Sequence, residues 1–244
     1  MSLKDDILKC VEQSGATIDP LIVRAAEHVE EMAEGEHDID TVLSWLAEKQ
    51  RDYPAQVEEV GVRDLSSWNV DEKSGNITHT SGKFFSIIGV RVKGAGEREV
   101  ASWDQPMMKQ TECSISGVIA KRFDGIRKYL FYAKFEPGNV NRVQLSPALQ
   151  VTESNLGRAH QGKKPRLAEY FEGEKGKLLT SVVDVEDGGR FFQKTNRTMI
   201  VEVADNEDVP MTDDYIWLTL PQIRRLLLVD NVINSLARDV CAVL

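Results

Sequence analysis

Residues 133–162 read AKFEPGNVNRVQLSPALQVTESNLGRAHQG. The first residues are typical of the end of a buried strand, and the run Glu136-Pro137-Gly138-Asn139 predicts a turn. A second extended run covers residues 143–152, and a polar segment then leads to His160. Side chains that bind anions or transfer protons are concentrated here. Because loops carried on a rigid scaffold usually hold the chemistry, we expect the functional site in this stretch.

Runs rich in β-branched and aromatic residues on both sides of the turn indicate buried strands. They are residues 84–92, 113–121, 128–135, 143–152 and 199–203. The dipeptide Asp124-Gly125 between two of these runs predicts a hairpin. Pro147 lies inside the run 143–152 and predicts a bulge or an edge position, because proline cannot donate to a neighbouring strand.

Helical patterns occur at both ends of the chain. Residues 3 to about 50 carry apolar side chains at helical spacing, with Asp19-Pro20 as a helix start. Residues 219–222 fit a capping box, and a last helix is expected over residues 232–243. Strands in the middle and helices at the ends predict an α+β fold with a mixed β-sheet flanked by helices. We therefore expect a helical appendage over residues 1–50 and one larger domain over residues 51–244.

Composition excludes several classes of function. The chain has 244 residues, 41% of them apolar, which is enough for a sizeable core. Its net charge of −9 argues against general nucleic-acid binding. Apolar runs fall short of the ~18–20 residues of a membrane span, and the start MSLKDDILK is too acidic for a signal peptide. Cys10, Cys113 and Cys241 are too widely spaced for a zinc cluster or a disulfide framework. A cytoplasmic protein with reduced thiols, without nucleic-acid or membrane partners, is expected.

Common catalytic signatures are missing: the sequence holds no G-x-G-x-x-G, Walker loop, H-E-x-x-H or G-x-S-x-G. Several longer phrases are distinctive instead. They are WNVDEKSGNITHTSGKFFSIIGVRV (68–92), WDQPMMKQTECSISGVIAKRF (103–123), AKFEPGNVNRVQLSPALQVTESNLGRAHQGK (133–163), NRTMIVEV (196–203) and WLTLPQIRRLLLVDNVINSLARDVC (217–241). In this order they resemble the bacterial NDP-hexose 2,3-dehydratases over roughly residues 40–244.

The resemblance implies a Nudix-like fold that eliminates water instead of hydrolysing a pyrophosphate. The sequence lacks the Nudix glutamate box that holds catalytic metal, so neither a metal nor another cofactor is expected. The implied substrate is a nucleotide-linked 4-keto-6-deoxyhexose, with dTDP as the expected nucleotide, from deoxysugar pathways of bacterial natural products. Family members typically carry two tandem copies of this unit and this sequence holds one. A homodimer can supply the second copy, since two-fold dimers are the commonest assembly.

Besides a pure scaffold built on the N-terminal helices, two alternatives to the dehydratase stay open. A single copy can be a degenerate relative that binds a nucleotide sugar without turnover. A Nudix-type pyrophosphohydrolase is the other alternative, and the missing glutamate box argues against it.

The implied reaction needs particular groups. A 4-keto group acidifies the proton on C3, its removal gives an enolate, and the C2 hydroxyl then leaves before tautomerisation to a 3,4-diketo sugar. A base, an acid and oxyanion donors are required. His160 is the first candidate for proton transfer, because its ordinary pKa of ~6.5 lies near working pH. Glu136 and Glu112 are alternative bases, and Tyr170 is a candidate acid or enolate donor. Each of three of these residues also has a possible structural role: His160 can anchor a loop, Glu136 can serve the turn and Tyr170 can pack in the core.

Further side chains are candidates for binding the substrate. Arginine and lysine suit the diphosphate, short polar groups suit sugar hydroxyls, and indoles stack on bases. The candidates for the diphosphate are Arg158, Lys163 and Arg197, and those for the sugar hydroxyls are Ser154, Asn155, Asn139 and Asn196. Trp68 and Trp103 are candidates for stacking on the nucleobase, and Gln105 and Gln110 can line the same pocket.

Overall fold

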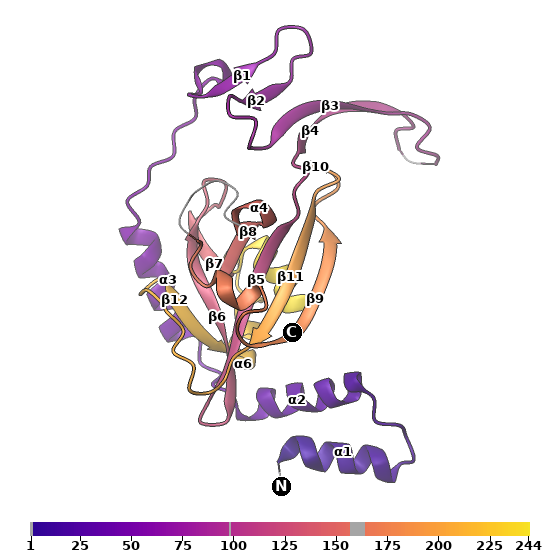
Figure 1. Cartoon of the computed structure of the whole chain (residues 1–244), viewed down its shortest axis with the longest axis vertical. Helices are drawn as coiled ribbons and strands as arrows, with labels where there is room; N and C mark the ends of the chain where they lie inside the picture. Colours follow the sequence, from indigo (N-terminus) through magenta and orange to yellow (C-terminus); the bar gives the residue numbers. More distant parts are fainter. Residues whose placement is uncertain (1, 98, 157–163) are drawn as a thin grey trace.

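The computed structural model describes residues 2–97, 99–156 and 164–244. Its body is built on a seven-stranded mixed sheet (Figure 1). The main path runs β12 (Tyr215–Thr219), β6 (Ile126–Phe135), β5 (Ser114–Phe123), β11 (Thr195–Glu202) and β9 (Lys177–Val185), while β7 (Val143–Pro147) pairs with β6 and β8 (Leu149–Thr152) with β5. The pairing of β5 with β11 is parallel and the others are antiparallel.

Helices flank this sheet, so the predicted α+β class is confirmed. The helices are α1 (Leu3–Gln13), α2 (Pro20–Glu34), α3 (Asp40–Asp52), α4 (Glu153–Leu156), α5 (Ala168–Phe171), α6 (Leu220–Leu226) and α7 (Ser235–Ala242). The capping box is present at α6, where the Thr219 side chain accepts from the backbone N–H of Gln222 and the Gln222 side chain reciprocates. Within the described ranges no helix is long and apolar enough to cross a membrane.

The sheet opens beyond the β5–β6 hairpin. Asp124 and Gly125 adopt positive φ values of 50° and 87°, as the predicted hairpin turn requires. The two strands pair with each other only near this turn, from Phe123↔Ile126 to Ala120↔Tyr129. Farther away they diverge, and residues 143–152 fill the gap. This run was predicted as one strand, but it switches from β6 to β5 after Pro147, where proline ends the pairing with β6.

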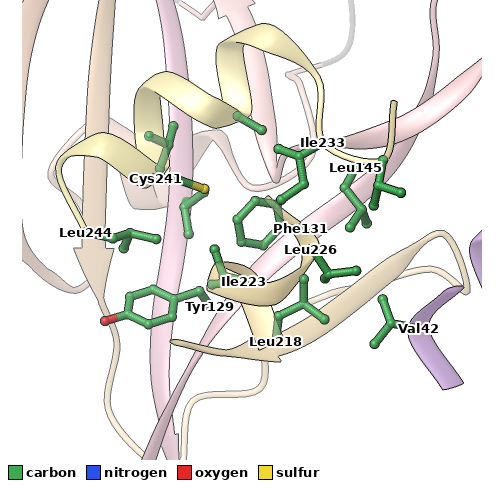
Figure 2. Packing of buried hydrophobic residues seen from close by; sticks show 14 of the residues in the cluster. Val42, Tyr129, Phe131, Leu145, Leu218, Ile223, Leu226, Ile233, Cys241 and Leu244 are labelled. Atoms are coloured by element: carbon green, nitrogen blue, oxygen red, sulfur yellow. The ribbon is translucent and has the colours of Figure 1, made fainter. Parts of the chain in front are cut away.

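The core lies on both faces of the sheet because strand side chains alternate. On one face Val118 and Ala120 of β5 join the cluster formed with α3, α6 and α7. Figure 2 shows Tyr129, Phe131 and Leu218 of the sheet in one cluster with Ile223, Leu226 and Cys241 of the helices. On the other face Ile115 and Ile119 pack with α5. Apolar side chains therefore cover both faces of the sheet.

Glycine is required where α5 meets the sheet. A Cβ at Gly117 would lie 2.2 Å from a ring carbon of Phe171, so only glycine allows this close contact.

The N-terminal helices are attached to the body by apolar and charged contacts. Val42 and Leu46 of α3 are buried in the main core cluster. Glu31 of α2 accepts hydrogen bonds from Arg127 and Tyr129 of β6. The predicted helical region 3–50 thus corresponds to α1, α2 and α3, while the division at residue 50 stays a prediction.

A second sheet forms an arm that extends from the body (Figure 1). After the short 3-10 helix Val62–Asp64, its order is β1 (Trp68–Val70), β2 (Ile77–His79), β3 (Ser86–Val92), β4 (Trp103–Lys109) and β10 (Phe191–Phe192). Strand β3 corresponds to the predicted run 84–92. The parallel pairing of β10 with β4 connects the arm to the segment that leads into β11.

Candidate active site

A cavity of about 740 Å³ lies at the open end of the body sheet. Ser114 at the start of β5, Asn196 near the start of β11 and Glu136 in the turn after β6 contribute to its wall. The 143–152 run contributes Gln150, and Lys194 completes the polar part. The first cavity therefore lies between the open end of the body sheet and the arm, and its wall combines polar groups with apolar side chains such as Phe85, Met108 and Leu236.

A second cavity, of about 690 Å³, adjoins the first. Both are lined by Phe85, Gln110 and Thr152, so they share a wall. The second cavity is also lined by Lys83 and Lys109 of the arm. Two adjoining spaces, the first with a mixed polar and apolar wall and the second with lysines and phenylalanines, can take the two halves of an elongated ligand.

Lys194 is the most unusual residue of the first cavity. The residue is 2% exposed, and its Nζ donates to the carbonyl of Glu112 at 2.7 Å, to Ser114 Oγ at 2.6 Å and to the carbonyl of Thr195 at 3.2 Å. Burial lowers the pKa of the Lys194 amine, while nearby acidic groups, Glu186 foremost, oppose this shift. Buried lysines with a lowered pKa are suited to proton transfer.

Asn196 lies beside this lysine. It is 5% exposed, and its Nδ2 donates to Glu186 Oε2 at 3.1 Å. Its Oδ1 is buried and has no hydrogen-bond partner in the described structure. Since buried polar atoms normally find partners, this oxygen is suited to accept a hydrogen bond from a bound molecule.

Glu136 is held from two sides. Lys134 Nζ lies 2.9 Å from its Oε1, and Asn234 Nδ2 donates to its Oε2 at 3.5 Å. Lys134 also donates to Gln150, another residue of the cavity wall. These contacts orient the Glu136 carboxylate at the cavity wall.

The structure brings together a subset of the predicted residues. Glu136, Gln110 and Asn196 line the first cavity, and Glu112 and Gln110 line the second. Trp68 packs against Phe85, which lines the second cavity, with 4.8 Å between the two ring centroids. Glu136, Pro137 and Gly138 of the predicted turn line the first cavity, and a functional site at this turn stays a prediction.

Other predicted residues lie elsewhere. Tyr170 is buried against the second core layer, and its hydroxyl donates to Glu207 at 2.8 Å. Burial and this hydrogen bond raise the pKa of Tyr170. Arg197 follows Asn196 directly, so the two side chains point to opposite faces of β11. Its guanidinium lies 3.8 Å from Glu153.

The remaining candidates have structural partners in the turn and the arm. Asn139 serves the turn, since its backbone N–H donates to the carbonyl of Glu136 and its amide to that of Arg142. In the arm, Trp103 Nε1 donates to Gln105, whose amide donates to the carbonyl of Gly189.

Several candidates from the polar segment are not located. Arg158, His160 and Lys163 lie outside the described residues. Ser154 and Asn155 belong to α4, but their side chains also lie outside the description. Their proposed roles stay predictions.

Lys194, Ser114 and Glu186 of the site were not predicted. Ser114 and Asn196 are neighbours only because β5 and β11 pair in parallel. One sequence signal was available, because Lys194 lies two residues before the predicted Asn196 in a polar approach to an apolar strand. Among the described residues, no group of His, Cys, Asp and Glu side chains is placed to hold a metal ion.

Comparison with known proteins identifies relatives of the chain. The family model described as NDP-hexose 2,3-dehydratase matches residues 39–244. A dTDP-4-dehydro-6-deoxy-alpha-D-glucopyranose 2,3-dehydratase of Amycolatopsis orientalis is 41% identical over 84% of this chain and 44% of its own length. A protein with the same name from Saccharopolyspora spinosa is 40% identical over 80% of this chain and 40% of its own length. Another from Streptomyces violaceoruber is 36% identical over 82% of this chain and 45% of its own length. The chain spans less than half of the length of these relatives.

Solved structures show weaker likeness. An ADP compounds hydrolase matches at a TM-score of 0.42 and 10% identity, over 76% of this chain and 94% of the hydrolase. A C. elegans Ap4A hydrolase matches at a TM-score of 0.35 and 14% identity, over 55% of this chain and 98% of the hydrolase. Likenesses this distant carry no argument, so the Nudix-like part of the fold prediction stays a prediction.

Proposed function

The chain belongs to the NDP-hexose 2,3-dehydratase family, and on this premise we propose that it removes the C2 hydroxyl of an NDP-4-keto-6-deoxyhexose as water. The reaction makes it a hydro-lyase of deoxysugar biosynthesis. The names of its relatives favour dTDP as the nucleotide.

The observation that carries the proposal is a cavity of fitting chemistry inside the region matched by the family model. Glu136 supplies a carboxylate, Asn196 an unpaired acceptor and Gln110 an amide. A sugar with a ketone and several hydroxyls needs these kinds of partners. The sugar is assigned to this first cavity.

The nucleotide is assigned to the adjoining cavity. Lys83 and Lys109 can neutralise a diphosphate, and Phe84 and Phe85 offer aromatic surface to a base. Trp68 packs against both phenylalanines, at 6.4 and 4.8 Å between ring centroids. Arg158 and Lys163 are proposed as further cations for the diphosphate.

The base at C3 is assigned to His160 first and to Glu136 second. Of these two residues, Glu136 is the one that the structure describes, and it lines the first cavity. A second copy of the unit from a partner chain in a homodimer, a cytoplasmic location and a role in natural-product biosynthesis complete the proposal.

Incubation with dTDP-4-keto-6-deoxyglucose tests the function. We expect mass spectrometry to show loss of one water from the sugar, whereas dTDP-glucose stays unchanged because it has no ketone to acidify C3. Binding of the keto sugar without water loss would favour a non-catalytic binding module. Release of nucleoside monophosphate on adding magnesium would favour a pyrophosphohydrolase.

The His160→Ala variant tests the base. If the imidazole removes the C3 proton, exchange of that proton in D₂O is lost, while dTDP binding measured by calorimetry stays near that of the unmodified protein. Full exchange in the variant would exclude His160 and leave Glu136 as the candidate.

A further inference from the structure

We propose that Ser114, hydrogen-bonded to Lys194, is the acid that protonates the departing C2 oxygen. The inference rests on the proposed dehydration and adds two residues to it. Both line the first cavity, together with Asn196 and Glu136.

The hydrogen bonds of Lys194 determine which group can reach the substrate. Its three N–H bonds are directed to the carbonyls of Glu112 and Thr195 and to Ser114 Oγ, so the ammonium is committed to protein acceptors. A hydroxyl has one hydrogen to donate besides its lone pairs. Among the described contacts Ser114 Oγ only accepts, so its hydrogen is available to an oxygen atom in the cavity.

Asn196 places a substrate hydroxyl beside this serine. Asn196 and Ser114 are directly paired across the parallel strands β11 and β5. Glu186 holds the Asn196 amide by its nitrogen, which leaves Oδ1 buried and without a partner. An unpaired acceptor next to an available donor matches a sugar hydroxyl, which both donates and accepts. This observation is independent of the lysine.

The surroundings of Lys194 favour proton release. Burial lowers the pKa of its amine, and the opposing acidic groups are Glu186 before β11, Cys113 and Glu112 before β5, and Glu153 of α4. A donor whose pKa lies nearer to working pH gives up its proton more readily. The ammonium also polarises the Ser114 hydroxyl, which by itself is a weak acid.

The base takes the C3 proton, and the electron pair forms the enolate with the C4 carbonyl. The C2–O bond then breaks with its pair on oxygen, and the enolate electrons form the C2–C3 double bond and restore the carbonyl. The leaving oxygen takes the Ser114 proton and departs as water, while Ser114 takes a proton from the Lys194 ammonium. The neutral amine regains a proton from solvent, as the base releases the one from C3.

The Ser114→Ala variant separates this step from the earlier one. We expect water loss to fall by about 10²–10⁴-fold, the usual contribution of a general acid. Exchange of the C3 proton in D₂O and the Kd for dTDP stay within about twofold, because neither needs the acid. Ser114→Thr keeps the hydroxyl and restores water loss. Ser44→Ala removes an exposed hydroxyl on α3, away from both cavities, and serves as the matched control.

A substrate with fluorine in place of the C2 hydroxyl distinguishes acid catalysis from a structural role. Fluoride departs with less need of a proton, so Ser114→Ala is expected to eliminate it at nearly the rate of the unmodified protein. A serine that only shapes the cavity would show no such rescue.

Lys194 acts through Ser114, so its test is the pH profile. In the unmodified protein water loss declines at high pH as the lysine loses its proton. In Lys194→Arg this decline moves to higher pH, because the guanidinium stays charged. An unmoved profile would overturn the role of Lys194.

Turnover by the unmodified protein is measured first, because its absence refutes the proposed function itself. If turnover is present, undiminished water loss in Ser114→Ala overturns only the inference. Equal loss of C3 exchange and water loss in that variant also overturns it, since the defect would then precede the acid step.

Discussion

Arg127 shows how single residues attach the N-terminal helices to the body. Its guanidinium is 3% exposed and contacts Glu31 and Glu27 of α2 and Glu202 of β11. The hydroxyl of Tyr129 donates to Glu31 at 2.7 Å. Such a buried cluster is favourable only while every charge keeps its partner, because taking the charges out of water is costly.

Replacing Glu31 by alanine is expected to lower the free energy of unfolding by about 3–5 kcal/mol, since it leaves the Arg127 charge and the Tyr129 hydroxyl without their buried acceptor. Denaturant unfolding measures this. The exposed Glu34 of the same helix provides the control, and Glu34→Ala should change stability by less than ~0.5 kcal/mol. Equal effects of the two variants would contradict the importance of the cluster.

The start of α7 links a secondary-structure element to the site. Asn234 is the N-cap, and its Oδ1 accepts from the backbone N–H of Ala237 at 2.8 Å, while its amide reaches Glu136. The segment before the helix is held on β7, because the carbonyl of Leu145 accepts from the backbone N–H of Asn234. One side chain thus begins a helix and orients a candidate base.

The Asn234→Ala variant should lose about 0.5–2 kcal/mol of stability, as usual for a removed N-cap. Asn234→Ser should recover that stability, because serine caps equally well, but it cannot reproduce the amide contact with Glu136. Water loss should therefore fall in both variants, by less than about tenfold, as expected for one weak hydrogen bond. Thermal unfolding and turnover are measured side by side. Full turnover in the serine variant would show that Glu136 needs no anchor.

Across the whole molecule, α1, α2 and the body meet at Glu27. Burial alone would raise the pKa of this carboxyl, but the hydrogen bond from Lys4 and the charges of Arg127 and Lys4 outweigh burial and lower the pKa to about 2. Because the folded pKa lies below the ordinary value of 4.5, the ionised group stabilises the folded state above about pH 4.5. This contribution is lost as the pH falls toward 2.

The stability difference between the unmodified protein and Glu27→Gln should therefore be largest near neutral pH and shrink between about pH 4.5 and 2. Urea unfolding at a series of pH values measures this difference. The variant Glu34→Gln, at an exposed position of α2, should show no comparable trend. A difference for Glu27→Gln that stays constant down to pH 2 would contradict the lowered pKa.

Local patterns in the sequence determined the elements. The β-branched runs, the Asp124-Gly125 turn and the capping box at Thr219 each depend on near neighbours, and the corresponding strand, turn and cap are present. The turn at Glu136 was also recognisable as a candidate for the site, since its residue types and the family phrases around it lie in one stretch, and it lines the first cavity.

Tertiary structure alone decided which polar groups meet. The pairing that puts Ser114 beside Asn196 joins strands far apart in the chain, and burial of Lys194 depends on everything packed around it. The alternation of side chains along β11 likewise separates Asn196 from Arg197, although they are adjacent in sequence. Sequence patterns report local conformational preference. The burial of a side chain and the groups that it contacts follow from long-range packing, which no short pattern encodes.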